Sequence, residues 1–179
     1  MIYLKISLDY LIISIAIAIV LILINMVFLP LQRKRKVYEL LTKIKQEKGY
    51  NLIDFKNKSY DFILENENKK IYIKVVYVPS NSAITINSRN TWSLMYGANP
   101  SKPGKRYPNQ RYLNELIPFL NFKPQDENNL KLIIVYKTTD KVQRYLNESE
   151  IKILNNNELV YDYQVITYVE LESHFDDLL

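Results

Sequence analysis

Residues 59–78 read SYDFILENENKKIYIKVVYV. This stretch predicts two strands, Tyr60–Leu64 and Ile71–Val78, because runs rich in β-branched and aromatic residues lie on either side of a polar turn. Asp61 lies at the start of the first strand, and Lys74 interrupts the otherwise apolar second strand. A lysine on a largely buried strand needs a partner, because burying an unpaired charge is costly. We therefore expect the Lys74 ammonium and the Asp61 carboxylate to lie on the same face of the sheet and to interact.

An uncharged stretch of 22 residues, Tyr10–Leu31, precedes this hairpin. A helix needs about 20 apolar residues to cross a bilayer core, so the sequence predicts a transmembrane helix over residues 10–32 that stops near Pro30. A cleaved signal peptide is the alternative interpretation. The apolar region of a signal peptide is usually shorter than this stretch and is followed by a small-x-small cleavage motif, which does not follow here. Asn25 is the one strongly polar side chain of the stretch, and it is either tolerated there or contacts another helix.

Positive charge follows the apolar stretch directly, since residues 33–36 read RKRK. Residues 1–9 hold only Lys5 and Asp9 as charged residues. Because cytoplasmic flanks are enriched in lysine and arginine, we expect a single-pass protein of the cell membrane with its N-terminus outside. Residues 1–9 are then a short extracytoplasmic segment, 33–36 a basic anchor, and 37–179 a cytoplasmic domain.

Composition excludes several classes of site. The chain has no cysteine, one histidine (His174) and three glycines. These counts exclude disulfides, thiol nucleophiles, zinc sites with cysteine ligands, sites built from several histidines and glycine-rich phosphate loops. The net charge of +5 is unevenly spread: residues 33–48 and 89–125 each carry +5, and residues 126–179 carry −6.

The remaining pattern predicts an α/β domain with a mixed sheet flanked by helices. Residues 89–109 are expected to be irregular, with three prolines and two glycines. The expected helices are Val37–Lys48, Gln110–Phe122, a short one within Lys141–Leu154, and Glu170–Leu179. The other expected strands are Tyr50–Phe55, Ala83–Asn87, Leu130–Tyr136 and Gln164–Val169.

This order of elements resembles the core of the PD-(D/E)XK, or restriction-endonuclease-like, superfamily, and more narrowly the NERD (nuclease-related) domain. The resemblance runs from about Val37 to Leu178 and implies a restriction-endonuclease-like fold. The NERD domain is often fused to a transmembrane helix, as the sequence also predicts here. The residues that carry the resemblance are Asp61, Ile84, Ile86, Trp92, Asn99-Pro100 or Pro108 with Gln110, Leu132–Val135, Val165–Val169 and Glu170-Leu171.

The chain departs from the family pattern at the Glu-x-Lys motif of the third strand. If Lys74 is the family lysine, Tyr72 stands at the glutamate position; if Lys74 replaces the glutamate, Val76 replaces the lysine. The resemblance implies a Mg²⁺ ion held by two carboxylates, with the lysine positioning water or phosphate. Asp61 supplies one carboxylate, so Asp61, Lys74 and Gln110 are expected to form a relic site, with Asp61 its metal ligand. Glu65 or Glu67, in the expected turn, is the alternative second carboxylate.

Residues 89–114 combine positive charge with aromatic side chains and contain no acidic residue. Cations neutralise phosphates and aromatic rings stack on bases, so this composition suits single-stranded nucleic acid. A solvated loop is the alternative interpretation, and Trp92 also suits a core position. The candidate nucleic-acid contacts are Arg89, Trp92, Lys102, Lys105, Arg106, Tyr107 and Arg111.

The sequence thus favours a membrane-anchored, catalytically inactive nuclease-related domain that binds nucleic acid or assembles with other proteins at the cytoplasmic face. Its expected partners are the lipid bilayer, nucleic acid, and other membrane or cytoplasmic proteins. No cofactor is expected, apart from Mg²⁺ if the domain is active. The alternatives are an active Mg²⁺-dependent nuclease with a migrated carboxylate, and a tethered protein-interaction domain.

Overall fold

The structure is a computed structural model, and it divides the chain into two compact units, Met1–Leu40 and Leu41–Leu179. The described residues are 2–55, 59–80, 82–97, 104–107, 113–126, 128–136, 139, 141–147, 150–155 and 158–178.

The first unit is helical. It contains α1 (Ile2–Leu23), a π-helical turn (Ile24–Phe28) and the start of α2 (Leu29–Lys48). Within the described part of the chain, one helical stretch, Tyr10–Lys48, is long and apolar enough to cross a membrane, by its length and composition alone. Signal sequences share that composition.

Pro30 does not end the helix, so the expected stop there is wrong. Proline has no N–H for the carbonyl of Met26, and its ring crowds that carbonyl. The π-helical turn immediately before it, where the Leu29 N–H bonds the Ile24 carbonyl, widens the helix at this point. The helix then continues to Lys48, and Gly49, with φ at +71°, lets the chain turn into the first strand.

The second unit contains a six-stranded mixed sheet with the order β1-β2-β3-β7-β11-β10. Its first three strands form an antiparallel meander, β7 is parallel to β3, and β11 is parallel to β7. The strand β7 is buried along its whole length, which explains its continuous apolar sequence. The strands are β1 (Asn51–Asp54), β2 (Phe62–Glu65), β3 (Lys70–Tyr77), β7 (Leu130–Tyr136), β10 (Leu159–Val160) and β11 (Tyr163–Thr167).

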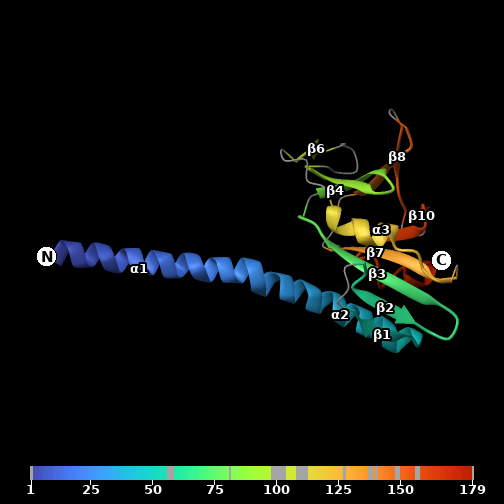
Figure 1. The fold of residues 1–179 in the computed structure, drawn as a ribbon, viewed down its shortest axis with the longest axis horizontal. Coiled ribbons are helices and arrows are strands. Elements are labelled where there is room, and N and C mark those ends of the chain that lie inside the picture. Colours follow the sequence, from blue (N-terminus) through green and yellow to red (C-terminus); the bar gives the residue numbers. More distant parts are fainter. Residues whose placement is uncertain are drawn as a thin grey trace. The chain divides into compact units, whose positions relative to one another are not determined.

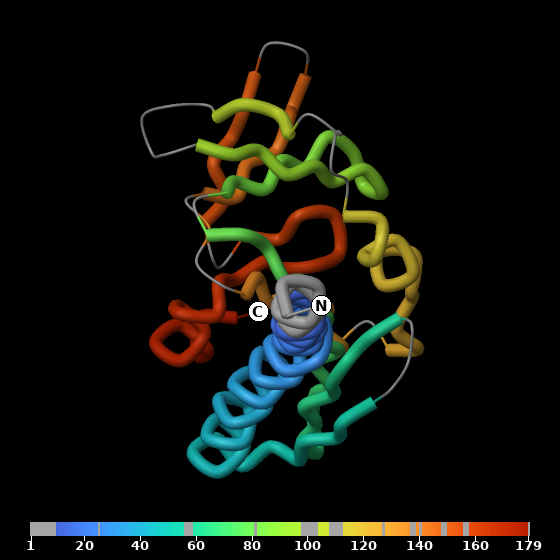
Figure 2. Tube along the Cα trace, turned by 90° about the vertical axis from the view of Figure 1, so that its left-hand side faces the viewer, coloured from blue at the N-terminus to red at the C-terminus, as the bar shows by residue number. Residues whose placement is uncertain are grey.

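A second, five-stranded sheet has the order β6-β5-β4-β8-β9. In Figure 1 the labelled strands β4, β6 and β8 lie apart from β1, β2, β3 and β7. The tube of Figure 2 follows the yellow-green β5 beside the green β4, its hydrogen-bonded neighbour. The strands are β4 (Ser82–Ser88), β5 (Thr91–Tyr96), β6 (Lys105–Arg106), β8 (Lys141–Tyr145) and β9 (Ile151–Ile153).

One apolar core joins the two sheets to the short helix α3 (Ile117–Asn121) and the 3₁₀ turn before it (Asn114–Leu116). The two sheets contribute Ile133 and Val135 from β7 and Ile84 and Ile86 from β4. The largest side chains buried in it are Trp92, Phe119 and Tyr163.

The structure corrects several expectations. The described residues form two sheets where one was expected, and residues 89–109 include the strand β5. The helix expected within Lys141–Leu154 is instead the pair of strands β8 and β9, because β8 hydrogen-bonds along β4 and so follows its long-range partner. Helix α3 is shorter than expected, and the end of the chain forms turns and a 3₁₀ turn (Phe175–Asp177). The α/β class is confirmed.

Candidate functional site

Asp61 and Lys74 form the ion pair that the sequence predicts. The Lys74 Nζ lies 3.1 Å from Asp61 Oδ1, and the Val75 N–H donates to Asp61 Oδ2 at 2.8 Å. The Lys74 side chain is 12% exposed and that of Asp61 is 29% exposed. Each oxygen of the carboxylate therefore already accepts a hydrogen bond within the protein.

The position of Asp61 follows from unequal strand lengths. β2 begins at Phe62, whereas its partner β3 runs on to Tyr77. The Asp61 N–H still donates to the Ile73 carbonyl at 2.8 Å, and the Asp61 side chain then accepts the hydrogen bond of the Val75 N–H on β3. A carboxylate thus replaces backbone where the ladder ends, because a buried N–H without a partner costs stability.

Tyr72, at the position where the resemblance implies a glutamate, belongs to an aromatic cluster. Its ring lies 5.2 Å from that of Tyr60 and 4.9 Å from that of Phe122, and Phe55 contacts Tyr60 at 5.3 Å. Tyr60 and Phe122 are also in contact, at 5.2 Å. The space beside Asp61 that a second carboxylate would need on β3 is therefore held by packed rings.

The two alternative carboxylates do not approach Asp61 along the hairpin. Glu65 lies at the far end of β2, where it pairs with Lys70 at 3.0 Å. Glu65 is four residues along the strand from Asp61, about 13 Å at 3.3 Å per residue. Glu67 is exposed in the turn that follows. Among the residues that the structure describes, no group of three or more aspartate, glutamate or histidine side chains is placed to hold a metal ion.

The basic and aromatic residues of 89–114 are separated by the fold. Trp92 is 2% exposed and packs 5.5 Å from the ring of Tyr163, so the expected base-stacking role for Trp92 is wrong. Lys105 and Arg106 are exposed on β6, next to β5. Tyr107 is half-buried, and its ring meets that of Tyr96 edge to face at 5.3 Å. Gln110, Lys102 and Arg111 lie outside the described residues.

Arg89 lies in the turn between β4 and β5 and is paired within the protein. It donates to Asp162 Oδ1 at 2.8 Å, and Asp162 Oδ2 accepts a hydrogen bond from Lys131 at 3.0 Å. Lys131 is 1% exposed, also donates to the Leu120 carbonyl at 3.0 Å, and lies 5.2 Å from the centre of the Phe119 ring. Burial lowers the pKa of Lys131, and the hydrogen bond to Asp162 opposes that shift.

The sequence interpretation missed this second ion pair. The pattern that predicts a partner for Lys74 also applies to Lys131, which interrupts the apolar strand LKLIIVY of residues 130–136. The partner, Asp162, is 31 residues away and follows the short strand β10, so no hairpin links the two. A lysine in a buried strand indicates a partner, but the chain order identifies that partner only when the two strands are adjacent.

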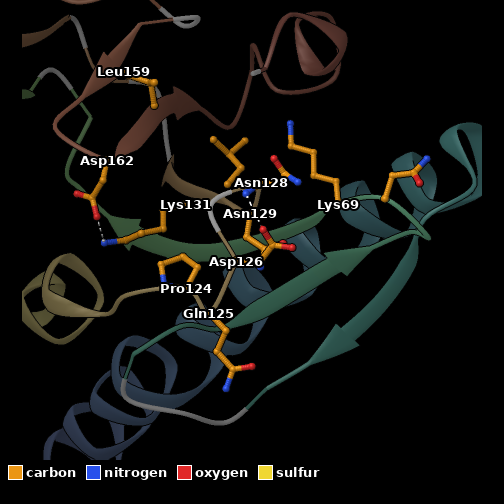
Figure 3. A pocket seen from close by; sticks show the side chains of 11 residues that line it. Lys69, Pro124, Gln125, Asp126, Asn128, Asn129, Lys131, Leu159 and Asp162 are labelled. Carbon is orange, nitrogen blue, oxygen red and sulfur yellow. Dashed lines mark hydrogen bonds and ion pairs between the residues drawn. The ribbon is translucent and has the colours of Figure 1, made fainter.

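An open pocket of 880 Å³ lies beside Lys131 and Asp162. Figure 3 shows Asp162 turned toward the Lys131 ammonium, with Lys69 and Asn128 on the other side of the pocket. Most of the residues that line the pocket have carboxamide or charged side chains. The lining residues come from the turn before β3, from residues 124–126 and 128–131, and from Leu159 and Asp162.

Comparison of the chain with models of known protein families, with curated proteins and with solved structures finds no match in any of the three. The features that bear on function are thus the ion pair of Asp61 and Lys74, the buried pair of Lys131 and Asp162, and the basic edge strand β6.

Proposed function

We propose that the chain is a membrane-tethered domain that binds single-stranded nucleic acid without cleaving it, on a restriction-endonuclease-like fold. The observation that carries the binding role is the edge strand β6, where exposed Lys105 and Arg106 lie next to the ring pair of Tyr96 and Tyr107. Cations on one strand neutralise phosphates, and tyrosine rings beside them offer faces to bases. Tyr96 is 40% exposed and so is accessible for stacking.

The arrangement around Asp61 supports a role without hydrolysis. A Mg²⁺ ion needs carboxylate oxygens that are not already committed to the protein. The Asp61 oxygens accept from Lys74 and from the Val75 N–H, and the aromatic cluster of Tyr72 takes the place of a second carboxylate. The pair serves here to join β2 and β3.

The order of strands supports the restriction-endonuclease-like fold. A helix leads into three antiparallel strands, and a further helix leads into a strand parallel to the third. Asp61 directly precedes the second strand, and Lys74 lies on the third, close to where the resemblance puts the aspartate and the lysine. The apolar helix and the RKRK run of residues 33–36 support a cytoplasmic location at the membrane.

A salt titration of binding tests the proposal. The full chain in detergent is mixed with a labelled single-stranded oligonucleotide, and affinity is measured at several salt concentrations without divalent ions. Each phosphate contact contributes about 0.7 to the slope of log affinity against log salt, so Lys105→Ala with Arg106→Ala should reduce that slope by about 1.4. Tyr96→Ala should weaken binding with little change in slope.

The control removes the same charge elsewhere. Lys43 and Lys48 are exposed and already paired with Glu172 and Asp176, so changing both to alanine should leave the slope unchanged. Absence of binding at low salt would contradict the role of β6. An equal reduction of the salt slope in the two double variants would also contradict it.

A further inference from the structure

The basic anchor, residues 33–36, is helical. The sequence predicts a stop near Pro30, but α2 runs without a break from Leu29 to Lys48 and so contains all four basic residues. Successive residues of an α-helix point about 100° apart. The RKRK run consists of four such residues, so its side chains leave the helix in directions that together cover the whole circumference.

The length of the apolar stretch sets the level of the basic anchor in a bilayer. As a helix, Tyr10–Leu31 spans about 33 Å, close to the thickness of about 30 Å of a hydrocarbon core. The anchor begins about 3 Å and ends about 8 Å beyond Leu31. The headgroup layer on each side of the core is about 5–8 Å thick. When the helix crosses the membrane, the four cationic side chains therefore lie at the level of the lipid phosphates.

The basic anchor keeps its positive charge accessible. The side chain of Arg35 is 80% exposed and Lys36 is also exposed, whereas Arg33 and Lys34 are half-buried. Glu39 pairs with Arg35 at 2.8 Å. Residues 33–39 hold four cations and this one carboxylate, which gives a net charge of +3.

We propose that the basic anchor binds the headgroups of anionic phospholipids and gathers a shell of these lipids around the helix. This inference rests on the membrane tether of the proposed function. Each basic side chain near an anionic membrane surface strengthens the attraction about fivefold. Because cations lie on every side of the helix, the attraction does not depend on how the helix is rotated. The level of the anchor favours lipid phosphate over the phosphate of nucleic acid, which approaches from the water phase.

Fluorescence quenching by brominated lipids tests the proposal. Phe28→Trp places a reporter on the apolar stretch, where Phe28 is 55% exposed, whereas the natural Trp92 is buried in the core. The full chain with this change is reconstituted in phosphatidylcholine vesicles that contain brominated phosphatidylglycerol or brominated phosphatidylcholine. At low salt, phosphatidylglycerol should bind beside the helix about fivefold more strongly than phosphatidylcholine. At about 1 M salt, where the screening length is about 3 Å, this preference should be lost.

Matched variants of the reporter chain identify the side chains responsible. Arg33→Gln with Lys36→Gln should bring the binding of the two lipids close to equal. Lys105→Gln with Arg106→Gln also removes one lysine and one arginine, but from β6, and should leave the preference for phosphatidylglycerol unchanged. An undiminished preference in the first double variant would overturn the proposal.

A change in the opposite direction is expected for Glu39→Gln. This variant removes the carboxylate that pairs with Arg35, so the preference for phosphatidylglycerol should rise, which a loss of folding would not produce. Equal quenching by the two brominated lipids in the unaltered anchor would overturn the binding of anionic lipid and leave the membrane tether standing. Quenching by neither lipid would overturn both, because the helix would then lie outside the bilayer. Neither result depends on oligonucleotide binding.

Discussion

At the scale of single residues, Asp61 joins β2 to β3 through its two carboxylate oxygens. Removing the side chain leaves the ammonium of Lys74 and the N–H of Val75 without their partner. Because Lys74 is 12% exposed, we expect Asp61→Ala to lower the free energy of unfolding by about 2 kcal/mol. Asp61→Asn keeps an oxygen for the Val75 N–H and should lose less.

Chemical denaturation of the full chain in detergent measures this difference. Glu67→Ala serves as the control, because Glu67 is exposed in the turn between the same two strands. Equal stability of Asp61→Ala and Glu67→Ala would show that the ion pair has no structural role.

Among the described residues, the buried ammonium of Lys131 depends on a single carboxylate for its charge partner. Its counterion Asp162 also receives the hydrogen bond of Arg89. Asp162→Asn leaves Lys131 charged and buried, so the variant should lose about 3 kcal/mol of unfolding free energy. Asp126→Asn, on the same pocket, keeps its acceptor for the Asn128 N–H and should lose less than about 1 kcal/mol.

The pH dependence of the same site has a definite sign. Burial lowers the pKa of Lys131 in the folded chain below its ordinary value of 10.5. The unfolded chain then binds more protons between the lowered pKa and 10.5, so stability rises with pH in that window. Lys131→Met removes this contribution. The unfolding free energy of the natural chain relative to Lys131→Met should therefore rise as pH increases toward 10.5; a fall would contradict the assignment.

At the scale of elements, a buried polar pair fixes β4 against β8. Thr85 and Gln143 are direct partners in the parallel ladder, and Gln143 Nε2 donates to Thr85 Oγ1 at 3.0 Å. Both side chains are buried, at 1% and 2% exposure. Thr85→Val leaves the amide without that acceptor and should cost about 1–3 kcal/mol, whereas Thr85→Val with Gln143→Met should recover part of the loss.

Thermal or denaturant unfolding of Thr85→Val, Gln143→Met and the variant with both changes completes a double-mutant cycle. Strictly additive losses would mean that the two side chains do not interact, and the register of β8 on β4 would then lack this support.

The elements that the sequence predicts well are those with a local signature. The strands of residues 59–78 and 130–136 have runs of β-branched and aromatic residues bounded by turns, and the structure places β2, β3 and β7 there. The Asp61–Lys74 contact was predictable because one hairpin brings the two strands together. By contrast, β5 and β8 are short, and their conformation depends on partners such as β4 that pair with them only in the folded sheet.

In the candidate site, too, the local contacts are predictable from the sequence and the long-range contacts are not. Lys131 stands in a strand that the sequence identifies, but its pairing with Asp162 depends on β11 lying beside β7. The aromatic side chain of Trp92 is of a kind that stacks on bases, but Trp92 lies in the core, because alternate residues of β5 face the space between the sheets. Burial of alternate residues appears only once the second sheet is known.

At the scale of the whole molecule, the long apolar helix and the run of positive charge in residues 33–36 predict one membrane crossing. With the C-terminal domain in the cytoplasm, protease added to intact cells should leave an epitope tag at the C-terminus undigested. Permeabilised cells are the control, since the tag should then be lost. Digestion in intact cells, or release of the chain after removal of a leader peptide, would contradict the topology.

The proposed function requires that the Asp61–Lys74 pair be structural and that the domain bind nucleic acid without hydrolysing it. The most direct test incubates the purified full chain with labelled single-stranded and duplex DNA and RNA in the presence of Mg²⁺ or Mn²⁺, alongside Asp61→Asn. We expect single-stranded substrate to be bound and all substrates to remain intact with both proteins. Cleavage that depends on the metal ion and is abolished in Asp61→Asn would contradict the account and identify Asp61 as a catalytic carboxylate.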